Sequence, residues 1–163
     1  MNNKDFYTVR GYQLLNEKEN VLTSSMEDYL EMIYRICSKE GFIRMNELAS
    51  HLNVRPSSAT KLVQKLRSVG FVNYQKYGMI QLTEEGREIG AFLLKRHRII
   101  ENFLHTIGVE DTLRDTEMIE HDISPGTLDN LHIFNNFFHE NPEILKRYEI
   151  YKDQWSQTKK NRG

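Results

Sequence analysis

The sequence has little of what marks several protein classes. It contains one cysteine, Cys37, so it cannot form an internal disulfide. Three prolines and nine glycines are few for 163 residues, and with 28% charged residues the composition is typical of a folded helical protein. No apolar run approaches the roughly 18 residues that cross a bilayer, and the start lacks a signal-peptide layout. These absences predict a cytoplasmic protein of one domain, or of two small units that share a core.

Negative charge is missing from one long segment. No Asp or Glu occurs from Asn53 to Thr83, although the formal net charge of the whole chain is −1. From Glu110 to Asp122 the balance reverses, and Arg114 is the single base among the acids. One segment is therefore suited to anions and another to cations.

Hydrophobic periodicity predicts a mainly α chain with one β-hairpin. Thr23 and the two serines after it offer N-caps for the first helix, and Gly41 ends it. The expected elements are a helix between Ser25 and Gly41, a short helix over 47–52, a third from Pro56 to near Gly70, a hairpin of 71–76 and 79–82, a long helix from Thr83 to Leu104, and helices near 110–123, 124–139 and 141–155.

This order of elements is typical of a winged helix-turn-helix with a small β-hairpin wing, followed by an α-helical dimerisation domain. We predict an N-terminal arm over 1–22, to which the pattern assigns no structure, and a DNA-binding domain over 23–92. A helical dimerisation domain over 93–155 and a basic tail over 156–163 complete the expected organisation.

Small polar residues open the third predicted helix, as a recognition helix that approaches phosphates requires. A single lysine there is typical of any solvated helix, but the missing acids favour double-stranded DNA as the partner. The residues expected to meet DNA, on this helix and at the hairpin tip, are Arg55, Ser57, Ser58, Thr60, Lys61, Gln64, Lys65, Lys76 and Tyr77.

Three predicted helices carry polar groups that can ligate a cation. Asp28 and Glu31 are three residues apart, so they share a face of the first helix that points away from its apolar stripe. His97 falls on the apolar stripe of the long helix, where a core histidine is the ordinary interpretation. The third group lies on one arc of the fifth predicted helix, where its carboxylates would repel each other without a cation. It contains Glu117, Glu120 and His121.

Four carboxylates and two imidazoles suit Mn²⁺ or Fe²⁺, with Co²⁺, Zn²⁺ and Cd²⁺ as further possibilities, and the lack of a cysteine argues against a thiolate zinc site. Two divalent ions would neutralise the four carboxylates. Six side chains are too few for two separate octahedral sites, so we expect two ions per subunit with bridging carboxylates and some water.

Taken together, these motifs resemble one family. The matching stretches are 23–31, Pro56–Ser58 with Thr60–Lys61 and Gln64–Leu66, Arg96–His97, and Glu117-x-x-Glu120-His121. They resemble the diphtheria toxin repressor family, in particular its manganese transport regulator branch, over about residues 23–140.

The resemblance implies a repressor that binds operator DNA as a dimer, when two metal ions bridge its DNA-binding and dimerisation domains, and that controls metal-uptake genes. It implies that all six candidate residues ligate metal, and that Glu31 and Glu120 bridge the two ions. Relatives that sense iron have a sulfur residue where this chain has Glu120, which favours manganese. The chain is also expected to end before any SH3-like third domain, as in the manganese branch.

Alternatives remain open at this point. One is an iron-responsive repressor of the same family, and another is a winged-helix regulator that binds DNA without metal. A carboxylate-bridged dimetal enzyme is a third, but di-iron bundles use two Glu-x-x-His pairs and this sequence has none. We therefore expect that the protein is not an enzyme. We also expect no membrane partner and no small organic ligand.

Overall fold

The computed structural model describes residues 22–160, without the side chains of Lys76, Lys159 and Lys160. It divides into two compact units, Met1–Arg96 (unit 1) and His97–Gly163 (unit 2). Apart from Leu22, the predicted arm over 1–22 lies outside the described residues, as does the end of the predicted tail. Within the described part, no helix is both long and apolar enough to cross a bilayer.

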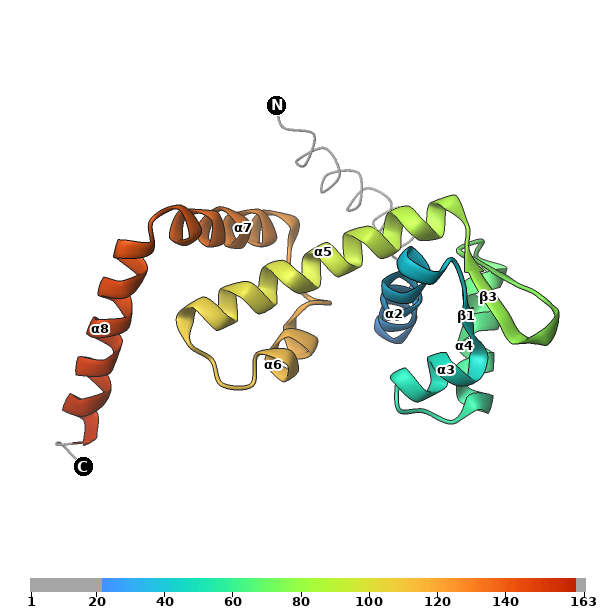
Figure 1. Cartoon of the computed structure of the whole chain (residues 1–163), viewed down its shortest axis with the longest axis horizontal. Helices are drawn as coiled ribbons and strands as arrows, with labels where there is room; N and C mark the ends of the chain where they lie inside the picture. The colour runs from blue at the N-terminus through green and yellow to red at the C-terminus, as the bar shows by residue number, and fades with distance from the viewer. Residues whose placement is uncertain (1–21, 161–163) are drawn as a thin grey trace. The chain divides into compact units, whose positions relative to one another are not determined.

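Unit 1 has the predicted winged helix-turn-helix (Figure 1). Helices α3 and α4 with the turn between them form the helix-turn-helix, and the β2–β3 hairpin follows as the wing. The elements are α2 (Ser24–Glu40), β1 (Ile43–Arg44), α3 (Met45–His51), α4 (Pro56–Ser68), β2 (Val72–Tyr74), the 3-10 turn η1 (Lys76–Gly78), β3 (Met79–Leu82) and the first half of α5 (Glu84–Ile107).

Local sequence signals set both ends of α2 and the start of α4 where the pattern predicted them. The Thr23 hydroxyl accepts a hydrogen bond from the Met26 N–H at 3.4 Å, which caps the first turn of α2. Gly41 ends the helix in a left-handed conformation (φ 82°), and its N–H donates to the Cys37 carbonyl. Pro56 occupies the first turn of α4, where its missing N–H costs no helical hydrogen bond.

The wing belongs to a three-stranded antiparallel sheet in the order β1-β3-β2. Ile80 of β3 lies opposite Tyr74 on one side and Ile43 on the other. The periodicity predicted the hairpin but not β1, because two residues are too few to show alternation.

The core of unit 1 lies under α2, and two glycines of α5 border it. Leu30 and Ile33 are completely buried, and the Cys37 thiol donates to the Ile80 carbonyl at 3.7 Å. Burial raises the pKa of that thiol to about 11. A Cβ at Gly86 would lie 1.9 Å from the Phe71 carbonyl oxygen, and one at Gly90 would lie 2.6 Å from the Tyr34 Cβ. Helix α5 can therefore approach its neighbours only without side chains at these positions.

Unit 2 is helical, as predicted. It contains the rest of α5, α6 (Thr112–Ile119), α7 (Pro125–Glu140) and α8 (Pro142–Lys160). Lys152 of α8 donates to the carbonyls of Ile107 and Gly108, at 3.0 and 3.1 Å, and so satisfies the C-terminal end of α5. Helix α8 continues five residues beyond the expected 155, so the described part of the predicted basic tail is helical.

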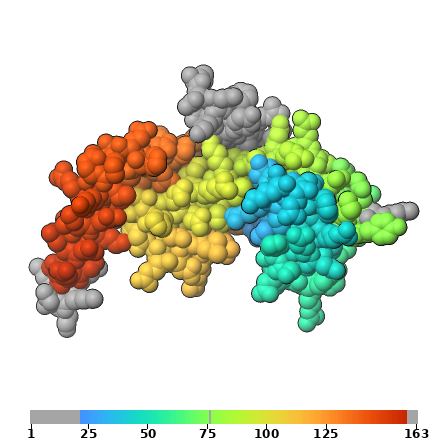
Figure 2. Space-filling model, in the orientation of Figure 1, coloured from blue at the N-terminus to red at the C-terminus, as the bar shows by residue number. Residues whose placement is uncertain are grey.

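Some apolar side chains of α7 pack inside unit 2, while others face outward. Phe134 contacts Phe103 of α5, with ring centroids 5.2 Å apart, and Leu128 is completely buried within the one chain. Ile133 is 64% exposed. Figure 2 shows the surfaces of α7 and α8 in orange and red, and the large apolar side chains exposed on these two helices are Ile133, Phe137, Ile150, Tyr151 and Trp155.

Candidate metal centre and nucleic-acid interface

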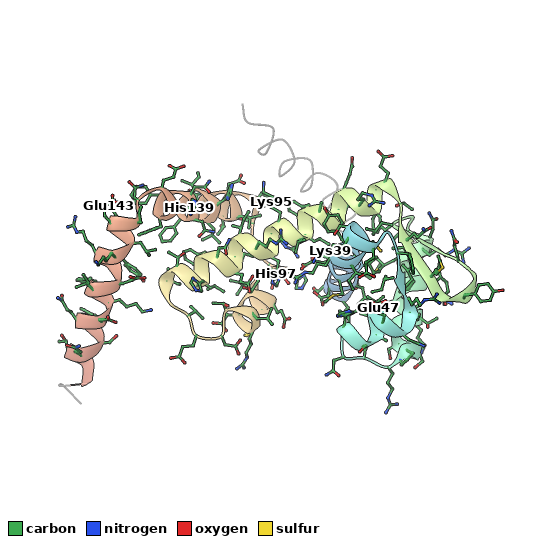
Figure 3. The ribbon with its side chains drawn as sticks, in the orientation of Figure 1. Lys39, Glu47, Lys95, His97, His139 and Glu143 are labelled. Carbon is green, nitrogen blue, oxygen red and sulfur yellow. The ribbon has the colours of Figure 1, made fainter. Side chains whose placement is uncertain are left out.

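His97 and Glu120 form a buried pair in unit 2. The Nδ1 atom of His97 lies 3.0 Å from Oε2 of Glu120, and the two residues are 5% and 3% exposed. His97 is labelled on α5 in Figure 3. Burying two ionisable groups is unfavourable unless they pair with each other or with a cation. The pair presents one nitrogen and one oxygen donor group, a combination that suits a divalent transition metal.

The end of α6 places Glu120. Glu120 is the C-cap residue, and its N–H donates to the Thr116 carbonyl at 3.0 Å. Thr116, one turn earlier, is completely buried, so the same side of the chain faces the interior at both residues.

The prediction that the fifth helix continues to 123, through His121, is wrong. The helix ends at Ile119 instead of continuing to 123, so His121 lies beyond it in a turn. Glu117 is exposed, Glu120 is buried and His121 is half-buried. Glu120, the C-cap, keeps helical dihedral angles (φ −65°, ψ −27°), so helical spacing still relates it to Glu117. The roles of Glu117 and His121 as ligands stay predictions.

Asp28 and Glu31 lie on α2 of unit 1, as predicted, but their surroundings differ. Asp28 is exposed, whereas Glu31 is only 7% exposed. The expectation that this face points away from the buried stripe is therefore wrong for Glu31. Its Oε1 atom accepts hydrogen bonds from Nε and Nη2 of Arg35, at 2.9 and 2.5 Å.

A second ion pair fixes α5 against α2 in unit 1. Nη2 of Arg96 lies 2.7 Å from Oε2 of Glu27, and Arg96 is buried. A charge-assisted hydrogen bond of this kind is worth more when water is excluded. The ion pair holds the backbone of α5 at Arg96, one residue before His97. We did not identify Arg96 as functional from the sequence, although a charged side chain beside a histidine on an apolar stripe was a usable signal.

The donor groups fit a hard or borderline divalent cation. They are carboxylate oxygens and imidazole nitrogens, which Mn²⁺ and Fe²⁺ accept. Cys37 is unsuited as a ligand because it is buried in the core of unit 1 and its raised pKa keeps the thiol protonated at neutral pH.

The predicted recognition helix, α4, presents most of its DNA-contact candidates to solvent. Those exposed along it and at its N-cap are Arg55, Ser57, Ser58, Lys61, Gln64 and Lys65. Thr60 differs, because it is half-buried and its hydroxyl donates to the Pro56 carbonyl at 2.8 Å. That hydroxyl bonds back to the first turn of α4 and can offer DNA only its acceptor capacity.

The wing tip carries the last two candidates. Tyr77 is 90% exposed and has a left-handed backbone (φ 70°), which turns the chain between β2 and β3. The Lys76 side chain lies outside what the structure describes. An exposed aromatic ring at the end of a hairpin is placed to reach a neighbouring surface.

Comparison with known proteins identifies the family. Residues 21–80 match the family described as "Iron dependent repressor, N-terminal DNA binding domain" and residues 83–149 match "Iron dependent repressor, metal binding and dimerisation domain". The chain belongs to the iron-dependent repressor family.

Individual relatives of this repressor agree with that assignment. The chain is 40% identical over 134 residues to the "HTH-type transcriptional regulator MntR" of Lysinibacillus sphaericus (strain C3-41), covering 81% of this chain and 96% of that protein. The crystal structure of the metal-dependent transcriptional regulator MtsR is 29% identical, with a TM-score of 0.63, covering 71% of this chain and 55% of that one. The manganese regulator SloR is 27% identical, with a TM-score of 0.61, covering 69% and 54%. The repressor spans about half the length of these two solved regulators.

The two family matches separate the candidate residues of the repressor. All the DNA-contact candidates fall within the DNA-binding match, together with Asp28 and Glu31. The other candidate ligands fall within the metal-binding and dimerisation match; they are His97, Glu117, Glu120 and His121.

Proposed function

We propose that the protein is a manganese-responsive transcriptional repressor that binds operator DNA as a homodimer. We further propose that each subunit holds two metal ions, with the six ligands Asp28, Glu31, His97, Glu117, Glu120 and His121. The observation that carries the proposal is the buried pair of His97 and Glu120, inside the segment that matches the metal-binding and dimerisation domain.

The chemistry of this pair supports a cation site. A histidine that ligates a metal is neutral and usually turns its second ring nitrogen toward a carboxylate or carbonyl, while ligating carboxylates are themselves hydrogen-bonded. When bound, the ions supply positive charge that offsets the four carboxylates of the proposed set. His97 would supply nitrogen and Glu120 would supply oxygen, both from buried positions.

Manganese is the favoured ion on two grounds. Oxygen-rich ligation suits Mn²⁺ more than it suits softer ions. The relative in L. sphaericus is named MntR, and a similar solved structure is that of the manganese regulator SloR. Iron remains the alternative ion because the family itself is described as iron dependent.

The effect on DNA follows from which parts of the chain carry the donors. Asp28 and Glu31 belong to the DNA-binding match and the remaining donors to the other match. If both sets of donors held the same ions, the motion of one part against the other would be restricted. A dimer needs its two recognition helices about 34 Å apart to enter successive major grooves. If only a fraction of the metal-free dimers has that spacing, the apparent affinity for DNA is lower by that fraction. Restricting all dimers to that spacing raises the apparent affinity by the inverse of the fraction.

The test is operator binding with and without Mn²⁺ at one fixed salt concentration, using a site selected from random DNA. We expect Mn²⁺ to strengthen binding by about 10- to 100-fold. His97→Ala should lose this response, whereas His105→Ala, which alters an exposed histidine of the same helix, should keep it. Equal affinity with and without Mn²⁺ in the parent would contradict the proposal.

A further inference from the structure

Arg35 holds the carboxylate of Glu31 with two hydrogen bonds. The Nε and Nη2 atoms both donate to Oε1, at 2.9 and 2.5 Å, so one oxygen receives both N–H groups. The two residues are four apart on α2, with the acid nearer the N-terminus, which is the favourable order for a helical ion pair.

Burial separates this contact from an ordinary surface pair. An exposed i,i+4 pair contributes roughly 0.3–0.5 kcal/mol because water screens both charges. Glu31 is only 7% exposed, so its carboxylate has lost most of its water and depends on protein groups for compensation. The guanidinium supplies a full positive charge to it. Arg35 itself is partly exposed and can rotate into solvent without being desolvated.

We propose that Arg35 is a built-in competitor of the metal ion at Glu31, and that it sets the Mn²⁺ concentration at which the repressor responds. This proposal rests on the proposed function, because it takes Glu31 to be a metal ligand. Arg35 has no ligand atom for a cation, so its part is to occupy the carboxylate while metal is scarce and to leave when metal is abundant.

Electrostatics requires the competition. A divalent cation on the Glu31 carboxylate would lie close to the guanidinium, and like charges at such a separation repel strongly where water is partly excluded. Binding therefore includes the cost of moving Arg35 away. If Arg35 occupies Glu31 about nine-tenths of the time without metal, the apparent affinity is lowered by about tenfold. The arrangement keeps a carboxylate-rich site stable without metal and raises its threshold.

The test compares Mn²⁺ binding by the full-length parent, Arg35→Met and Lys39→Met. Methionine keeps much of the length of the side chain and removes its charge. Lys39 is the matched control because it is exposed, lies one turn further along α2 and carries the same charge. We expect Arg35→Met to lower the Mn²⁺ dissociation constant on the order of tenfold, measured by calorimetry, and Lys39→Met to leave it within about twofold.

Thermal melting gives a second readout that does not depend on DNA. Without metal, Arg35→Met should melt below the parent because Glu31 loses the Arg35 guanidinium, and saturating Mn²⁺ should raise its melting temperature by more than it raises that of the parent. Equal shifts in Arg35→Met and Lys39→Met, or unchanged or weaker Mn²⁺ binding in Arg35→Met, would overturn the competition. A parent that binds no Mn²⁺ would overturn the proposed function as well.

Discussion

The Nδ1 atom of His97 lies 3.0 Å from Oε2 of Glu120 although 23 residues separate them in the chain, and both side chains are almost fully buried. The two arrive there by different means. His97 lies on the buried side of a long helix, and Glu120 lies at the point where α6 stops. Because each group compensates the burial of the other, a change at either one affects both.

Replacing Glu120 with cysteine should move the metal response from Mn²⁺ toward Fe²⁺. The substitution removes a carboxylate, which Mn²⁺ prefers, and supplies a softer sulfur ligand. The measurement is DNA affinity across a series of metal ions, under anaerobic conditions for iron. Asp122→Cys is the control, since it places a thiol on an exposed residue two positions away. If Glu120→Cys kept the metal preference of the parent, Glu120 would not be a selectivity ligand.

Lys61→Ala should weaken binding to all DNA sequences and flatten its salt dependence. Lys61 is exposed on α4, and one lost phosphate contact reduces the slope of log K against log salt by about 0.9. The slope is measured by titrating DNA at several salt concentrations in saturating Mn²⁺. Lys39→Ala, on a different helix, should leave the slope unchanged. A parental slope in Lys61→Ala would place that lysine away from the phosphates.

Much of the fold could be predicted because its signals are local. The signals at Thr23, Gly41 and Pro56 begin or end helices through neighbouring residues. The alternation of side chains predicts the hairpin without reference to a distant segment. Strand β1 was missed because pairing with β3 creates it, and no pattern within two residues records that pairing. Non-local pairing of this kind is what a single sequence shows least.

The candidate site was predictable in composition but not in geometry. His97 and Glu120 were both identified from the chain, yet α6 ends at Ile119, so the helix expected to carry His121 stops before it. The partner of Glu31 was missed although i,i+4 spacing from Arg35 was visible. That spacing is common on solvated helices, and only the burial of Glu31 makes it significant.

Ile133→Asp should dissociate the dimer. We predict that α7 lies at the subunit interface, because it exposes Ile133 and Phe137 in the segment expected to dimerise. Leu128 is already buried within one chain, so the exposed Ile133 is the better probe. Two-fold symmetry would remove two isoleucines per dimer, which raises the dissociation constant by at least about a hundredfold. Sedimentation measures this, with Val54→Asp in unit 1 as the control; an unchanged dimer would exclude Ile133 from the interface.

Cys37 should make the protein less stable at alkaline pH. Its pKa is about 11 in the folded state against an ordinary value of 9.0, so between these values the unfolded chain ionises while the folded one keeps its proton. The free energy of unfolding therefore falls as the pH rises from about 9 to 11. Burial also raises the pKa of Tyr29, so the effect of Cys37 is isolated by comparison with Cys37→Ala. Parallel stability curves for the two proteins over this range would contradict the prediction.

The bare α-carbons of Gly86 and Gly90 limit how the gene can change. Every missense mutation of a glycine codon introduces a residue that has a Cβ. At Gly86 that atom would collide with the carbonyl oxygen of Phe71, a main-chain atom that no rotamer change can move, and at Gly90 it would collide with the Cβ of Tyr34. No missense mutation of either codon is therefore neutral for this fold. In a saturation library selected for repression, we expect both positions to retain glycine alone, while exposed positions such as Ser50 accept many residues.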